Sequence, residues 1–310
     1  MTNESHDGFE PKLRVRASGY GGSGYRVPTR PDADGKLPVY PGVTTVLGAL
    51  DKGGITQWSV DMTAHYAVNN VDQLLNRTKE QGFRFLRYYS KRKVDFDDPE
   101  VDIHNAYEGV LNDLANIGTL IHDAVAYELV GEFGPDFTRD EQVEAFEAFL
   151  EWQSQHDIEV VLVEATVFNP ALGYLGTLDY YLIIDGESWL LDGKSSRAVR
   201  ESHKAQAAAL YNSPIRMAQV DADDPEGVEY DTKQWGKTYW KEVPMPVPDR
   251  VGFLHFRPND WDKDGNLIPA FCHLVEMHPD ELEPAYEIFK GALMAAKGKQ
   301  KLKKIEKENS

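Results

Sequence analysis

The chain has 310 residues, a formal net charge of −18 and a hydrophobic fraction of 41%. This composition excludes an intrinsically disordered chain, and the single cysteine, Cys272, excludes a disulfide framework and a four-cysteine zinc or iron–sulfur site made by one chain. The excess of acid also argues against a protein that coats nucleic acid with its whole surface, because phosphate binding needs local cations.

The N-terminus carries no apolar signal region, and no later stretch approaches the length needed to cross a bilayer. We therefore expect a cytoplasmic protein with no membrane partner. The basic residues are uneven along the chain: arginines gather in a glycine-rich head, seven basic residues lie between Arg77 and Lys93, and lysines crowd the stretch from Lys297 to Lys307. Such runs are most often solvated faces or frayed ends, and we expect residues 297–310 to be a frayed lysine-rich tail.

The sequence of residues 1–98 predicts an irregular or partly ordered head followed by a helical lobe. Residues 1–40 are rich in Gly, Arg, Pro and Asp without periodicity. Thr44 or Thr45 could cap a short helix, a longer amphipathic helix follows around Trp58 to Val68, and helical patterns continue through 70–93.

Residues 99–296 predict the core of the protein. A long helix is expected from Pro99 to Val130 and another from Asp140 to Gln155. Three consecutive antiparallel strands follow within 158–168, 173–184 and 188–193, and then come a helix over 197–212, strands around 251–256 and 268–276 joined by a turn at 262–265, and a closing helix over 279–296. This order predicts an α/β (α+β) fold with a mixed central sheet flanked by helices.

The triplet Asp192-Gly193-Lys194 is the first candidate for chemistry. Alternation along a strand places the carboxylate and the amine on one face, where both can reach the same phosphate or water. An acid-x-Lys triplet occurs four times in the chain, but only this one directly follows an apolar run, Trp189-Leu190-Leu191. The others are better explained as surface charge.

A second carboxylate, Asp179, lies in the preceding predicted strand, and a hairpin can bring it near Asp192. Two aspartates at close range without a cation would repel, so that one would be protonated. Mg²⁺ resolves the repulsion because it prefers oxygen ligands and commonly uses one or two carboxylates. His122, beside the apolar stripe of the long helix, is the third candidate; alone, such a histidine is more often a core residue than a ligand.

Four ordered motifs resemble those of the PD-(D/E)XK nucleases, in the RecB-like and phage exonuclease branch that includes lambda exonuclease. They read Gly118-Thr119-Leu120-Ile121-His122, Gly176-Thr177-Leu178-Asp179, Asp192-Gly193-Lys194 and Gln206. The resemblance covers residues 100–215 well. Pro41 to Leu47 also looks like a segment near the start of the phage members, and Met245-Pro246 with Val251 to Phe256 looks like their late strand.

The resemblance implies a restriction-endonuclease-like core and Mg²⁺-dependent cleavage of DNA, with Mn²⁺ as a substitute and without ATP or an iron–sulfur cluster. His122, Asp179, Asp192 and the carbonyl of Gly193 would hold one or two metal ions, and Lys194 would orient or deprotonate the attacking water. Implied partners are duplex ends or single strands of DNA, an annealing or recombination protein, and further copies of the chain. The residues assigned to substrate contact are Gln206, Thr177, Ser195, Ser196 and Glu164. For Glu164, a contact with metal and a structural role stay open as alternatives.

The family helix usually has a tyrosine four residues after the glutamine, whereas here Leu210 holds that place and Tyr211 comes one residue later. A P-loop is set aside because Ser188 stands where Gly193-Lys194-Ser195 would require a glycine five residues earlier. A nuclease-like protein without activity, serving as an acidic interaction protein or DNA-end adaptor, remains the alternative, and the net charge favours it. Exonuclease action on DNA in phage-type recombination or repair is the expectation; polarity and strand preference stay open.

Overall fold

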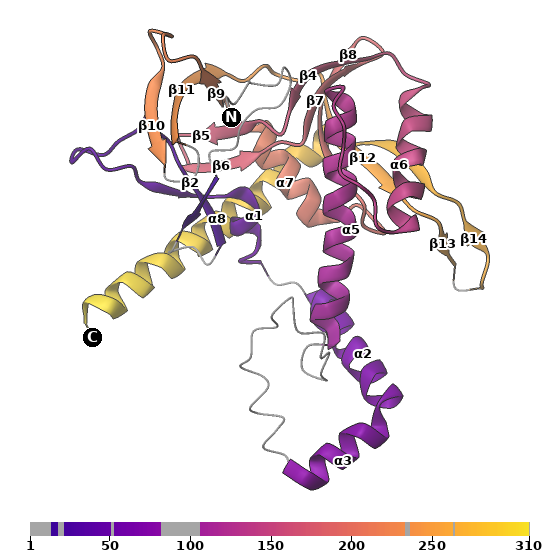
Figure 1. Cartoon of the computed structure of the whole chain (residues 1–310). Helices are drawn as coiled ribbons and strands as arrows, with labels where there is room; N and C mark the ends of the chain where they lie inside the picture. Colours follow the sequence, from indigo (N-terminus) through magenta and orange to yellow (C-terminus); the bar gives the residue numbers. More distant parts are fainter. Residues whose placement is uncertain are drawn as a thin grey trace. The chain divides into compact units, whose positions relative to one another are not determined.

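The computed structural model describes residues 14–17, 22–50, 53–81, 106–232, 236–262 and 264–309 (Figure 1). These residues form a mixed α/β fold with seven helices and a mixed five-stranded sheet beside further sheets, which confirms the predicted fold class. The chain divides into two compact units, Met1–Leu50 with Leu120–Ser310, and Asp51–Thr119. No helix among the described residues combines the length and the apolar character needed to cross a membrane.

The division into units differs from the predicted boundary at residue 98. Residues up to Leu50 belong with the core because the head forms strands and a short helix that contact it. The strands β1 (Arg14–Ala17), β2 (Gly22–Arg26) and β3 (Val39–Pro41) make an antiparallel sheet, and Gly42 bridges to Leu175. These segments are therefore regular strands within a head that the sequence predicted to be irregular or partly ordered.

The unit of residues 51–119 contains α2 (Gly53–Asn69), α3 (Val71–Gln81) and the first part of α5 (Ala106–Leu129). The predicted helix around 58–68 is confirmed, and the predicted helical stretch 70–93 is confirmed as far as Gln81. The remainder of that stretch and residues 99–105 of the predicted long helix lie outside the described residues. The last turns of α5, from Leu120 onward, belong to the larger unit.

The mixed sheet has the order β15 (Phe271–Glu276), β12 (Arg250–Arg257), β8 (Glu187–Lys194), β7 (Tyr180–Ile184), β4 (Ile158–Val163). Strands β8 and β12 are parallel and the other neighbours are antiparallel. A second, antiparallel sheet has the order β10 (Val228–Thr232), β11 (Gly236–Pro244), β9 (Ile215–Val220), β5 (Thr166–Asn169), β6 (Tyr174–Thr177).

Two of the predicted strands are each broken in two. The segments 158–168 and 173–184 pair along their length, but β4 and β7 belong to the mixed sheet, whereas β5 and β6 belong to the antiparallel sheet. The hairpin changes sheets at Glu164, whose φ of 57° lies in the left-handed region that residues other than glycine rarely adopt. Strands β9, β10 and β11 were not predicted, and the predicted turn at 262–265 lies between the short strands β13 (Asp260–Trp261) and β14 (Leu267–Ile268).

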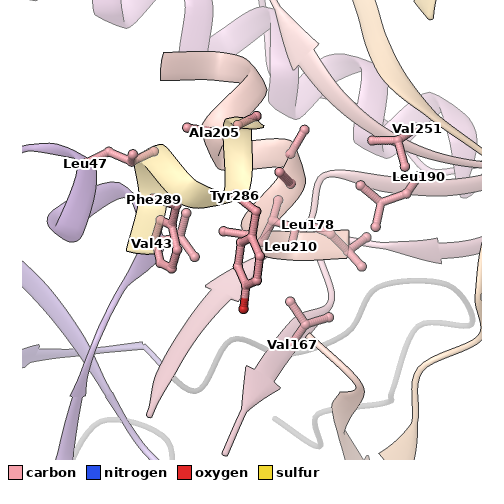
Figure 2. Packing of buried hydrophobic residues seen from close by; sticks show 14 of the residues in the cluster. Val43, Leu47, Val167, Leu178, Leu190, Ala205, Leu210, Val251, Tyr286 and Phe289 are labelled. Carbon is pink, nitrogen blue, oxygen red and sulfur yellow. The ribbon is translucent and has the colours of Figure 1, made fainter. Parts of the chain in front are cut away.

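Helices cover both faces of the mixed sheet. Helix α6 (Asp140–Gln153) packs on β12 and β15, and α7 (Glu201–Tyr211) packs on β8, β12 and α8 (Pro279–Glu308). Figure 2 shows the core between α7, α8, the short helix α1 (Val43–Leu47) and the strands. Gly42 precedes α1 without a side-chain cap, so the expectation that Thr44 or Thr45 caps this helix was wrong.

Helix α8 continues through Glu308, where the sequence predicted an end at Ala296 and a frayed tail. The last turns consist largely of Lys, Glu, Gln and Leu, which are strong helix formers. The Nζ atom of Lys297 also donates to the carbonyl of Leu172, which ties this part of α8 to the turn between β5 and β6.

Candidate active site

The end of β8 carries the central group of the site. Asp192 is fully buried, and Lys194 lies on the same face of the strand, with its Nζ atom against Oδ2 of Asp192. The other oxygen, Oδ1, accepts a 2.8 Å hydrogen bond from Nε2 of Gln206 on α7. Within the described part of the chain, Oδ2 accepts no hydrogen bond of ordinary geometry. The predicted pairing of Asp192 and Lys194 on one strand face is thus present.

Asp179 reaches the same place from the neighbouring strand. It lies where the hairpin passes from one sheet to the other, and its carbonyl accepts a 2.8 Å hydrogen bond from the backbone N–H of Glu164. Oδ2 of Asp179 accepts a 2.8 Å hydrogen bond from the backbone N–H of Gly193. This bond fixes the carboxylate beside the residue that separates Asp192 from Lys194.

His122 approaches from α5, and its ring lies against Gly193, the residue between Asp192 and Lys194. Its Nδ1 atom lies 3.6 Å from Oδ2 of Asp179, and its ring makes an edge contact with Phe256 at 5.2 Å between centroids. A Cβ atom at Gly193 would stand 2.7 Å from Cε1 and 3.0 Å from Nδ1 of His122, closer than side chains allow. The imidazole can therefore lie against β8 because residue 193 is a glycine.

The site concentrates negative charge in a buried place. Burial raises the pKa of Asp192 to about 6, the Asp179 carboxylate adds to the rise, and Lys194 opposes it. Burial likewise raises the pKa of Asp179 to about 6, with Glu164 adding to it and Lys194 opposing it. Burial lowers the pKa of Lys194, but the two aspartates outweigh burial and hold it above the ordinary value. The positive charge of Lys194 thus compensates one negative charge at a place where burial disfavours the ionised form of both aspartates.

The chemistry of these groups fits a divalent cation. Within the described residues, no three His, Cys, Asp or Glu side chains converge closely enough to enclose a metal ion by themselves. Mg²⁺ commonly takes only one or two carboxylates and completes its shell with waters and substrate phosphate, so the pair Asp179 and Asp192 suffices in number. The buried Oδ2 of Asp192 contacts the charged Lys194 amine and has no other polar partner among the described residues, so a bound cation would take over or share this oxygen.

The other predicted site residues differ in how they relate to Asp179 and Asp192. Ser195 and Ser196 follow Lys194 directly, and the hydroxyl of Ser196 donates to the carbonyl of Ala198 at 3.0 Å. The hydroxyl of Thr177 is engaged with that of Tyr25 at 3.1 Å.

Glu164 lies at the bend and is half-buried, and its charge acts on Asp179. Gln206 bonds Asp192 itself, whereas the resemblance implied a contact with substrate. Tyr211 packs against the hydrophobic core, and Leu210 is buried at 1% exposure. Tyr211 therefore serves as a packing contact in the structure.

Two residues of β12 that sequence reasoning did not select hold the segment after Lys194. The Nε2 atom of His255 is 2.7 Å from the carbonyl oxygen of Ser196, and Nη1 of Arg257 donates to the carbonyl of Ser195 at 2.8 Å. His255 stands opposite Lys194 in the parallel pairing of β12 with β8. That parallel pairing joins residues 61 positions apart in the chain, and no local pattern in the sequence indicates it.

The chain matches no protein-family model and no curated protein.

Proposed function

We propose that this chain is a Mg²⁺-dependent deoxyribonuclease that acts as an exonuclease on DNA in phage-type recombination, repair or processing. The observation that carries the proposal is the meeting of Asp179, Asp192 and Lys194 at Gly193, with His122 against the same glycine. The order of the motifs, which resembles that of the PD-(D/E)XK nucleases, supports the same reading. A cytoplasmic site of action and an annealing or recombination protein as partner belong to this proposal.

Each residue has a part in the proposed reaction. Asp179 and Asp192 would hold the metal, together with His122 and the carbonyl of Gly193. When bound, Mg²⁺ supplies Lewis-acid chemistry: it lowers the pKa of a water and stabilises negative charge on the phosphoryl group, and Mn²⁺ can supply the same chemistry.

Lys194 is held in its charged form by the aspartates, so it can orient the attacking water and oppose the charge that develops on phosphorus. Gln206 keeps Asp192 oriented through the bond to Oδ1, and such outer bonds to metal-binding groups tune affinity. Thr177, Ser195, Ser196 and Glu164 are the proposed substrate contacts, and among them Ser195 and Ser196 lie nearest to Lys194 along the chain.

A nuclease-like adaptor without activity is the second candidate. The net charge of −18 favours it, and so does the finding that no three potential ligands converge within the described residues. The intact pair of carboxylates beside a buried lysine favours the enzyme, because burying two acids without a task costs stability.

The test is incubation with end-labelled linear DNA and closed circular DNA, with and without Mg²⁺. An exonuclease degrades the linear DNA only, an endonuclease cuts both, and an adaptor cuts neither. Lys194→Ala should abolish cleavage while DNA binding stays nearly intact, since binding depends on dispersed cations. The matched control is Lys290→Ala, which removes a half-buried lysine paired with Glu287 on α8. Cleavage by Lys194→Ala at the wild-type rate would refute the assignment.

A further inference from the structure

The last three turns of α8 differ in charge from the rest of the chain. Residues 297–308 hold six lysines, at positions 297, 299, 301, 303, 304 and 307, and two acids, Glu306 and Glu308, whereas the whole chain has a net charge of −18. The segment is helical as far as Glu308 and is exposed from Lys301 to Asn309. Figure 1 shows this yellow end of α8 running on to the C-terminus.

The lysines of this helix end are poorly compensated by carboxylates. Elsewhere in the larger unit, exposed cations are commonly paired, as Arg30 is with Glu242 and Lys237 is with Glu229. On the helix end, Lys304 lies 3.9 Å from Glu308, but Lys299, Lys301 and Lys303 make no ion pair with any described residue.

The arrangement opposes the stability of the isolated chain. Lysines 299, 303 and 307 recur every four residues, and 297, 301 and 304 form a neighbouring row, so like charges stand one above another on the helix. Burial lowers the pKa of Lys297, and the charge of Lys301 lowers it further. A polyanion laid along these rows would relieve the repulsion.

The end of α8 lies far enough from the acidic remainder of the larger unit for a polyanion to contact it. Eight residues separate Gln300 from Glu308, and at 1.5 Å per residue the helix advances by about 12 Å over them. The Debye length is about 10 Å at 0.1 M salt, so much of the repulsion from the body is screened at the helix end. The hydrogen bond from Lys297 to the carbonyl of Leu172 holds the start of this segment against the turn between β5 and β6.

We propose that residues 297–308 of α8 form the surface that holds the phosphate backbone of duplex DNA, an inference that rests on the proposed function. DNA is the fitting partner because the cations occupy two adjacent rows of the helix, and phosphates neutralise such rows without side-chain complementarity. The contact is independent of base sequence and adds affinity without taking part in hydrolysis.

The test compares two triple variants that change the net charge equally. Lys299→Gln/Lys301→Gln/Lys303→Gln removes the unpaired lysines, and Lys36→Gln/Lys237→Gln/Lys290→Gln removes three lysines that lie within 4.0 Å of a carboxylate. Glutamine has nearly the helix propensity of lysine, so α8 should stay folded, which circular dichroism checks. Binding to a fluorescent duplex is measured in EDTA between about 50 and 200 mM salt.

The slope of log K against log salt should become shallower by about 0.9 for each lost phosphate contact, or up to about 2.7 for the helix variant, and stay unchanged in the control. Equal slopes for the wild type and the helix variant would overturn the inference. So would equal losses in both variants, an absence of duplex binding by the wild type, or a shift in sedimentation showing that the helix variant disrupts an assembly of chain copies.

Hydrolysis of bis(p-nitrophenyl) phosphate with Mg²⁺ separates this inference from the proposed function. The helix variant should hydrolyse this small phosphodiester at the wild-type rate, because the substrate is too short to reach α8 from β8. If the wild type fails to hydrolyse DNA while the salt slope changes as expected, the nuclease proposal fails and the DNA-binding helix stands.

Discussion

Asp192→Asn should change the pH dependence of stability in a defined direction. Burial raises the pKa of Asp192 from the ordinary 3.8 to about 6, and each tenfold change in an equilibrium is worth about 1.4 kcal/mol, so ionisation of Asp192 costs the metal-free fold about 3 kcal/mol. Because the folded pKa is the higher one, the protonated group's contribution is fully present below about pH 4 and is lost as pH rises through about 6.

Asparagine resembles the protonated acid, so the variant escapes this loss. In EDTA, urea denaturation should give wild type and variant similar stability near pH 4, and should show the variant about 3 kcal/mol more stable near pH 7. Mg²⁺ at about 1,000 times its Kd should reverse the order at pH 7, since a ligand at that concentration adds about 4.1 kcal/mol to the protein that binds it. A stability difference that does not vary with pH, measured in EDTA, would refute the reasoning.

Three further results are expected from the same geometry. Gly193→Ala should lower the free energy of unfolding by about 1–3 kcal/mol and should also lower the rate of cleavage, because the new Cβ would meet His122 at 2.7 Å. The control for both measurements is Gly291→Ala, which has open space around the new atom. Gln206→Ala should weaken Mn²⁺ binding to Asp192 about 10–100-fold by calorimetry, because Oδ1 loses its donor. Mn²⁺ affinity should also fall as pH drops through about 6, where the two carboxyls of the site become protonated.

A different result would contradict each of these three predictions. A Gly193→Ala protein with wild-type stability and rate would show that the imidazole does not need the space at β8. Unchanged Mn²⁺ affinity in Gln206→Ala would reduce that residue to a packing role. An affinity that is flat between pH 5 and 7 would show that the metal does not depend on these carboxylates.

Short-range patterns predicted how the side chains of the site are placed. Alternation along β8 placed Asp192 and Lys194 on one face, and the hairpin of β7 and β8 brought Asp179 beside Gly193, as the sequence indicated. Helical periodicity placed His122 on α5 next to the apolar stripe.

The division of the strands between two sheets and their long-range pairing could not be predicted from such local patterns. The bend at Glu164, which divides the strands between two sheets, depends on one backbone angle and on packing from both sheets. Strands β9 to β11 carry charged and half-exposed residues, so their alternation is weak. The parallel pairing of β12 with β8, which brings in His255 and Arg257, joins segments with no sequence link.

Diffraction from Mn²⁺-soaked crystals would show whether Asp179 and Asp192 share a divalent cation. We expect one or two anomalous peaks, at least one of them at bonding distance, about 2.0–2.3 Å, from a carboxylate oxygen of both aspartates, with the Lys194 amine displaced from Oδ2. A map in which Mn²⁺ binds elsewhere, while Lys194 stays against Asp192, would contradict it.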